Sequence, residues 1–227
     1  MLSRIAGAVV PALGSLTVTT DTGTAPRPGS VIVANHTSLS DPAVVLAALH
    51  RLGVRPTVLA TAGLWRIPLL GAALTREGFV PVHRGGPRAA EALDGAAAAL
   101  AAGGIVLLYP EGGLPVRRDP RETAPGPFRS GVWRLATATG APVVPLGQAG
   151  SRRLASGGGA KQLAGLLTAP LRRPALHVHV GAPFQLPADR DEALTLVRRA
   201  VTDCWRTAAS RTGESVPPAP VPAEQTV

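Results

Sequence analysis

The chain has 227 residues, which fits one domain of ordinary size, and its 45% hydrophobic content excludes a chain that is disordered throughout. It carries 23 Lys and Arg against 14 Asp and Glu, a formal net charge of +9, which favours anionic partners such as lipid headgroups and phosphorylated small molecules. The three Trp, one Tyr and three Phe form no basic–aromatic pattern for stacking bases, so no nucleic-acid partner is expected. The single cysteine, Cys204, excludes an internal disulfide and a CxxC metal or redox site.

Near the start of the chain, Arg4 is followed by an apolar stretch over residues 5–13. Gly7 and Pro11 weaken the alternative of a secretory signal peptide, so residues 1–14 are better interpreted as a short interfacial helix lying on a bilayer. No window reaches the roughly 20 apolar residues that a membrane-spanning helix needs. We therefore predict a cytoplasmic protein that is peripheral to the inner face of the cell membrane and contacts its anionic surface.

After this segment, short β-branched runs alternate with Ala- and Leu-rich helical runs, which is typical of an α/β protein. We expect one domain over residues 15–211, with a mixed, mostly parallel sheet flanked by helices, and a disordered tail over 212–227. The expected strands are Leu16–Thr20, Val31–Ala34, Thr57–Ala60, Phe79–Val82, Ile105–Tyr109, Val143–Leu146 and Leu176–Val180. The expected helices are Pro42–Leu52, Ile67–Thr75, Pro87–Ala102, Ser130–Thr139 and Ala188–Ser210. Irregular loops are expected at 117–127 and 151–160.

His36 and Asp41 form the first candidate site. An apolar strand ends at His36 and a helix begins at Asp41, and catalytic groups often lie where a buried strand ends. Histidine changes charge near neutral pH and can remove a proton from an alcohol. An acid five residues later can fold back and fix the imidazole tautomer by a hydrogen bond. The alternative is that Asp41 only caps the helix, with Pro42 at the first helical position, and that His36 is a loop histidine.

Three further segments offer polar groups at strand ends or a helix start. Glu111 provides a carboxylate, and Gly112 a backbone that a ligand can approach, although a plain turn fits both. Arg84 lies at a strand exit, where a guanidinium can bind phosphate through two hydrogen bonds, or is a solvated surface charge. Arg129 precedes a helix N-terminus and is either an anion contact or part of an ordinary helix entry.

His177 and His179 share one face of the last expected strand. Two histidines at i and i+2 can begin a metal site, but no third ligand is near in sequence. A half-exposed strand is the better interpretation, and no metal is expected. Cys204 lies in a helical apolar stripe and is interpreted as a buried structural thiol.

The order of these segments is more specific than any one of them. The blocks are Asn-His-x4-Asp over 35–41, Gly-Phe-Val-Pro-Val-His-Arg over 78–84, Tyr-Pro-Glu-Gly over 109–112 and Ala-Pro-Val-Val-Pro over 141–145. Together they resemble the four-block signature of the glycerolipid acyltransferase family, which includes the 1-acyl-glycerol-3-phosphate acyltransferases. Phe-Arg-Ser-Gly over 128–131 is similar to the family's Phe-Lys-x-Gly. The resemblance covers roughly residues 30–184.

This resemblance implies a glycerol-3-phosphate acyltransferase-like fold and an O-acyltransferase of phospholipid biosynthesis that needs no cofactor. The donor would be acyl-CoA or acyl-carrier protein, and the acceptor a lysophospholipid hydroxyl, that of 1-acyl-glycerol-3-phosphate. His36 would be the general base and Asp41 its partner. The substrate-binding residues would be Arg84 for the phosphate, Glu111 and Gly112 for the glycerol part, and Arg129. No feature of the sequence indicates an oligomeric state.

The third block departs from the family pattern Pro-Glu-Gly-Thr-Arg. Gly113 and Leu114 replace the Thr and Arg, which removes a hydroxyl and a positive charge near the expected phosphate. Arg117, Arg118 or Arg121 would have to supply that charge. Two alternatives therefore stay open: the same chemistry on a glycolipid, an ornithine lipid or a specialised metabolite, and a non-catalytic lipid-binding relative.

Overall fold

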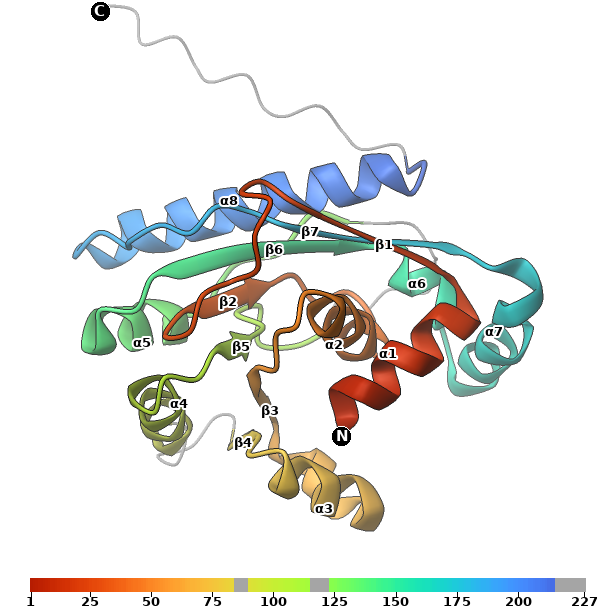
Figure 1. Ribbon diagram of the computed structural model, residues 1–227, viewed down its shortest axis with the longest axis horizontal. Coiled ribbons are helices and arrows are strands. Elements are labelled where there is room, and N and C mark those ends of the chain that lie inside the picture. Colours follow the sequence, from red (N-terminus) through yellow and green to blue (C-terminus); the bar gives the residue numbers. More distant parts are fainter. Residues whose placement is uncertain (84–89, 115–122, 215–227) are drawn as a thin grey trace, which may run out of the picture.

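The structure is a computed structural model that describes residues 1–83, 90–114 and 123–214. In these residues seven strands form one sheet with the order β1-β7-β6-β2-β5-β3-β4 (Figure 1). Neighbouring strands are parallel, except that β6 and β7 are antiparallel. The mixed, mostly parallel sheet expected from the sequence is confirmed. The strands are β1 (Ser15–Thr20), β2 (Val31–Ala34), β3 (Thr57–Thr61), β4 (Val80–Val82), β5 (Val106–Leu108), β6 (Val143–Ala149) and β7 (Ala175–Val180).

Helices pack on both faces of the sheet, with α1 and α2 on the opposite side from α8 (Figure 1). Ile32 of β2 belongs to the apolar cluster shared with α1, α2, α3 and α7, and Val33 to the cluster shared with α4, α5 and α8. All four residues of β2 are buried, which explains its unbroken apolar run. The helices are α1 (Leu2–Leu13), α2 (Asp41–Arg51), α3 (Pro68–Arg76), α4 (Glu91–Ala101), α5 (Gly131–Thr139), α6 (Ser151–Leu154), α7 (Gly159–Arg172), α8 (Arg190–Arg211) and a 3-10 helix, η1 (Ala62–Arg66).

The predicted strands and helices are present, and apart from the start of α4 their ends differ from the prediction by at most three residues. The helix predicted from Pro87 ends as expected, but its first residues lie outside the described ranges. The loop predicted over residues 151–160 is wrong. This segment contains α6, and α7 begins at Gly159. The three consecutive glycines at 157–159 suggested an irregular loop, but they lie between the two helices and at the start of the second.

The half-exposed strand predicted for His177 and His179 is also wrong, because the two side chains are 3% and 8% exposed. Strand β1 pairs with β7 in a register that sets Thr17 opposite His177 and Thr19 opposite His179. The hydroxyl of Thr19 lies 2.9 Å from His177 Nε2 and 2.8 Å from His179 Nδ1. The histidines are therefore buried and hydrogen-bonded. The prediction that Cys204 is buried is confirmed.

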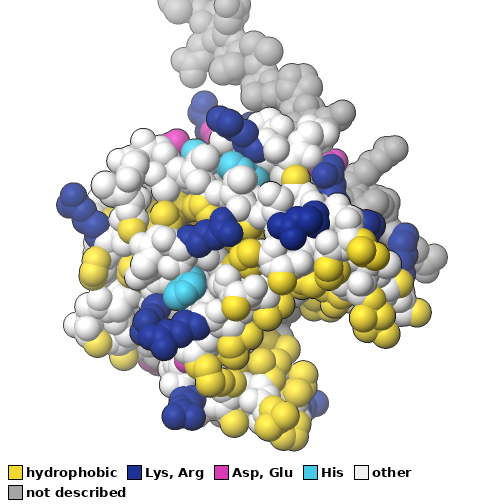
Figure 2. Space-filling view, turned by 45° about the vertical axis from the view of Figure 1, so that its right-hand side comes forward, with side chains coloured by type: hydrophobic (Ala, Val, Ile, Leu, Met, Phe, Trp, Pro, Cys, Tyr) yellow, Lys and Arg dark blue, Asp and Glu magenta, His cyan; other side chains and the backbone are white. Residues whose placement is uncertain are grey.

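The helix expected at the N-terminus forms as α1 and packs against α2. Ala6 and Val10 enter the core, whereas Met1, Ile5 and Val9 on the other side are about half exposed. Within the described residues, no helix is both long and apolar enough to cross a bilayer. Figure 2 shows hydrophobic side chains gathered over part of one face of the molecule, with Arg and Lys side chains among them and few acidic ones.

Candidate active site

The candidate residues meet at one edge of the sheet. Strands β2, β5 and β6 run parallel, so their carboxyl ends lie at the same edge. His36 follows β2, Glu111 follows β5, and Gln148 is near the end of β6. Ligands of open parallel sheets bind at such an edge, because the loops that follow the strands converge there.

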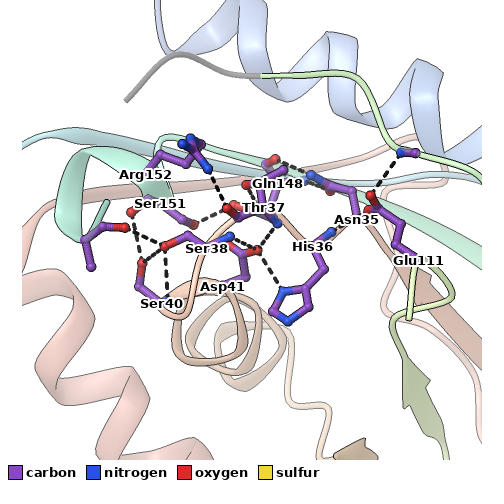
Figure 3. Close-up of polar contacts among 12 residues, drawn as sticks. Asn35, His36, Thr37, Ser38, Ser40, Asp41, Glu111, Gln148, Ser151 and Arg152 are labelled. Atoms are coloured by element: carbon purple, nitrogen blue, oxygen red, sulfur yellow. Dashed lines mark hydrogen bonds and ion pairs between the residues drawn. The ribbon is translucent and has the colours of Figure 1, made fainter. Parts of the chain in front are cut away.

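His36 and Asp41 contact each other directly (Figure 3). The imidazole Nδ1 lies 3.0 Å from Asp41 Oδ2, and the two side chains are 15% and 0% exposed. With Nδ1–H donating to the carboxylate, the imidazole carries its free electron pair on Nε2, which has no hydrogen-bond partner among the described residues. The pair therefore presents a basic nitrogen at a partly open position and keeps its acid buried.

Asp41 does more than begin a helix. Besides the His36 contact, its Oδ2 accepts hydrogen bonds from the backbone N–H groups of Thr37 and Ser38, the latter at 2.8 Å. It lies in the first turn of α2, where the positive end of the helix dipole stabilises a carboxylate. The N-cap position is Ser40, so the alternative that Asp41 acts as the capping residue does not describe its contacts.

The turn between β2 and α2 is fixed by contacts with β6 and α6. Asn35 donates to the carbonyl of Gln148 at 3.1 Å and accepts from its N–H at 2.8 Å, so the side-chain amide continues the pairing of β2 with β6. Arg152 donates to the carbonyl of Thr37 at 2.7 Å. Gln148 and Arg152 were not predicted as site residues, because more than a hundred positions separate them from the turn.

Two hydroxyls complete this support. Ser38 Oγ donates to the carbonyl of Ala155 at 2.8 Å, and Ser40 Oγ to that of Ser151 at 2.9 Å. Leu39, between the two serines, is 66% exposed. The turn is therefore bonded to α6 on both sides of a leucine that points into solvent.

Glu111 ties the turn to a second loop. One carboxylate oxygen accepts from His36 N–H at 2.8 Å and the other from Gly126 N–H at 2.9 Å. Burial raises the pKa of Glu111, and these two N–H groups oppose that rise in part. As placed, Glu111 positions the backbone of His36.

Tyr109 packs on the imidazole of His36, with ring centres 4.6 Å apart and planes inclined by 33°. Its hydroxyl is buried and has no hydrogen-bond partner among the described residues. Burial, with a smaller contribution from the charge of Asp41, raises its pKa well above the usual value, so the phenol stays protonated. Tyr109 was part of the sequence motif, but nothing in the motif indicated contact with His36.

Gly112 and Arg129 are also brought together. Gly112 has φ +73°, and a Cβ placed on it would lie 2.0 Å from Arg129 Nε, so the guanidinium lies directly over the glycine backbone. Arg129 N–H donates to the carbonyl of Pro110 at 2.9 Å, which fixes its main chain beside the same loop. The Arg129 side chain is exposed and has no hydrogen-bond partner among the described residues.

The remaining predicted contact, Arg84, lies outside the described residues, as do Arg117, Arg118 and Arg121. Leu114 is described and, being apolar, supplies no charge to the site. Within the described part of the chain, no group of three His, Cys, Asp or Glu side chains is placed to hold a metal ion.

The structure is that of an α/β protein with a mostly parallel sheet, and its candidate active site is the His36–Asp41 pair at the strand ends. Residues 15–148 match the family described as Acyltransferase, and they include β1, β2 and the whole His36–Asp41 turn. The chain belongs to this acyltransferase family.

Individual relatives agree with this assignment. The chain is 30% identical over 125 residues to a chloroplastic 1-acyl-sn-glycerol-3-phosphate acyltransferase of Brassica napus, and 29% identical over 126 residues to one of Arabidopsis thaliana. Each match covers 55% of this chain and only about a third of the relative, 34% and 33%. The fold is similar to that of the 1-acyl-sn-glycerophosphate acyltransferase PlsC of Thermotoga maritima, with a TM-score of 0.69 and 18% sequence identity. The match covers 95% of this chain and 81% of that chain.

Proposed function

We propose that this protein is an O-acyltransferase of phospholipid biosynthesis, which transfers a fatty acyl group from acyl-CoA or acyl-carrier protein to the hydroxyl of a lysophospholipid. The observation that carries the proposal is the His36–Asp41 pair at the carboxyl end of β2, inside the segment that matches the family. The proposed acceptor is 1-acyl-glycerol-3-phosphate, which both plant relatives have in their names.

In the proposed reaction, His36 Nε2 removes the proton from the acceptor hydroxyl as the oxygen attacks the thioester carbonyl. The tetrahedral intermediate then collapses, the carbon–sulfur bond breaks, and the thiol leaves with the proton returned by the imidazolium. Asp41 holds the tautomer that leaves Nε2 free and stabilises the positive charge that His36 acquires. The reaction balances without an oxidant, a reductant or a metal.

Binding of the acceptor phosphate is assigned to Arg129 and Arg84. The Arg129 side chain lies over Gly112 in the loop that follows β5 and is solvent-exposed. The residue before Gly112, Glu111, accepts a hydrogen bond from the His36 N–H. A guanidinium binds phosphate through two parallel charge-assisted hydrogen bonds. Gly112 leaves room for that side chain, and Glu111 holds the His36 backbone in place. Binding of the glycerol part of the acceptor is assigned to the remaining lone pairs of Glu111.

The proposed location is the cytoplasmic face of the cell membrane. The large exposed apolar residues here are Met1, at the N-cap of α1, and Ile5 and Val9 within it. Their spacing of four places them on one side of the helix. No acidic residue occurs before Asp21, so this end of the chain is basic and apolar. These properties suit an interfacial helix on an anionic bilayer.

The proposed function is tested by incubating the purified protein with radiolabelled acyl-CoA and a panel of acceptors. The panel contains lysophosphatidic acid, other lysophospholipids, a lyso-ornithine lipid and a lysoglycolipid. Label in phosphatidic acid is expected, and label only in another product would move the assignment to that acceptor. Absence of transfer to every acceptor, from both acyl-CoA and acyl-carrier protein, would favour the non-catalytic lipid-binding alternative.

A further inference from the structure

Helix α7 exposes its leucines instead of burying them. Leu163, Leu166, Leu167 and Leu171 are 59%, 36%, 70% and 90% exposed, and Ala169 is the only residue of α7 that is buried. Their spacing of three and four places them on one face of the helix. A surface helix of a globular protein normally turns such a stripe toward the core, so this row is available to a partner.

The charge around α7 indicates an anionic partner. Residues 151–175 contain no acidic residue. Of their basic residues, Lys161, Arg172 and Arg173 are exposed, whereas Arg152 is buried and Arg153 pairs with Glu214. Lys161 is exposed near the start of the helix, and Arg172 and Arg173 are at its end. A second copy of this chain would bring the same positive charge to the contact and be repelled. A row of leucines between basic ends is typical of helices that lie in the headgroup region of anionic bilayers.

Helix α7 lies beside the helix already proposed to contact the membrane. α1 and α7 pack against each other, and Arg173 donates to the carbonyl of Pro11 at 3.5 Å (Figure 1). The exposed rows of the two helices therefore come from distant parts of the sequence and belong to adjacent elements. Figure 2, which brings the right-hand side of Figure 1 forward, shows hydrophobic side chains gathered on that face with Arg and Lys side chains among them.

The short helix before α7 is bonded to the candidate active site. Carbonyls of Ser151 and Ala155 accept hydrogen bonds from Ser40 and Ser38, on either side of the exposed Leu39. A surface bound by α7 would therefore lie next to the turn that carries His36.

We propose that α7 is a second membrane-contacting helix, whose leucines enter the interface of an anionic bilayer beside α1 and, through α6, hold the turn 36–41 at the lipid surface. This proposal rests on the proposed function only for the idea that the acceptor lies in the bilayer. Binding itself is independent of acyl transfer, so it is measured without an acyl donor.

The test places an environment-sensitive nitrobenzoxadiazole label on single cysteines, in Leu167→Cys and Leu171→Cys. Cys204 does not compete for the label, because it is 5% exposed and burial raises its pKa to about 12. The control is Leu196→Cys, a leucine of 40% exposure on α8, which lies on the opposite side of the sheet from α1. With vesicles of phosphatidylglycerol and phosphatidylcholine, we expect a blue shift and stronger emission at positions 167 and 171 and none at 196. With phosphatidylcholine alone, we expect a smaller response.

A second variant measures how much the exposed leucines of α7 contribute to the affinity for anionic vesicles. Leu167→Gln combined with Leu171→Gln is expected to weaken binding to the anionic vesicles by about tenfold or more, since each leucine loses apolar burial. Leu196→Gln is expected to bind as the unaltered protein does. Transfer to a soluble short-chain acceptor should be unchanged in both, which separates a failure of docking from a failure of the proposed function.

The proposal is overturned if labels at 167 and 171 respond no more than the label at 196, or if the double variant binds vesicles normally. It is also overturned if the labels shift without vesicles as the protein concentration rises, which would assign the row to a second copy of the chain. A shift caused by an acidic carrier protein instead of vesicles would overturn it in favour of a protein partner.

Discussion

At the scale of single residues, Asp41 is the buried charge on which the proposed base depends. We expect Asp41→Asn to lower kcat by about 10²-fold or more, because the amide is uncharged and cannot stabilise the imidazolium. Thermal unfolding measures the stability of the variant, and steady-state transfer measures its kcat, so a loss of folding is separated from a loss of catalysis. Asp189→Asn, which changes the exposed N-cap of α8 in the same way, is the control and should leave transfer unchanged. Full activity of Asp41→Asn would contradict the assigned role.

Gly112 permits a second test at this scale. Gly112→Ala combines backbone strain at φ +73° with displacement of the Arg129 side chain, whereas Gly53→Ala has the same strain at φ +76° and open space around it. Both should lower the free energy of unfolding, by about 1–2 kcal/mol for the backbone alone. Only Gly112→Ala should reduce kcat/KM for the phosphorylated acceptor, by roughly tenfold. Equal kcat/KM values in the two variants would remove Arg129 from the phosphate site.

At the scale of elements, the end of β2 is held by a side chain that acts as backbone. Asn35 is fully buried and bonds both the N–H and the carbonyl of Gln148. Asn35→Ala leaves both groups without a partner, so we expect the free energy of unfolding to fall by about 2–4 kcal/mol in urea titrations. Thr22→Ala, at an exposed hydroxyl, should change stability little. A loss in Asn35→Ala no larger than in this control would show that β6 does not need the amide.

The elements also show what the sequence could predict. Strand β2 was predicted with its observed ends, because a buried parallel strand needs an unbroken apolar run. Helix α7 was missed, since its glycine-rich start suggests a loop and its leucines do not face the core. The Asn35–Gln148 pairing could not be predicted, because the contact depends on how two strands register after the chain has folded.

At the scale of the whole molecule, the sheet edge formed by β1 and β7 makes stability depend on pH. His177 is buried, and this burial, with smaller contributions from His179 and Arg211, lowers its pKa from 6.5 to about 4. The unfolded chain therefore binds a proton between these pH values that the folded chain does not. The free energy of unfolding should fall as pH drops from about 6.5 to about 4, by up to about 3 kcal/mol from this residue.

Replacing His177 tests this dependence. His177→Gln keeps groups that can bond the threonine hydroxyls of β1 but does not titrate, so urea titrations between pH 7 and 4 should show a shallower fall in stability. An unchanged slope would assign the acid sensitivity to other groups.

The site as a whole was predictable in its parts but not in its assembly. His36, Asp41 and Glu111 were identified from blocks in a characteristic order, and Arg129 from the segment 128–131 between two of them. The structure brings all four to one edge of the sheet. The residues that hold these side chains in place were not identified. Tyr109 packs on the imidazole of His36 and Arg152 bonds the turn, and both contacts depend on packing between distant segments. The same reason explains the error at His177 and His179, because nothing in β7 alone indicated that β1 would pair beside it and that α8 would pack against it.

The most direct measurement is acyl transfer by His36→Ala compared with the unaltered protein, using radiolabelled acyl-CoA and lysophosphatidic acid. His36 is partly exposed and has one side-chain hydrogen bond, so the variant should fold with a similar melting temperature. We predict that the unaltered protein forms phosphatidic acid and that His36→Ala, equally folded, forms it at least a hundredfold more slowly. Near-full transfer by a folded His36→Ala protein would contradict the account.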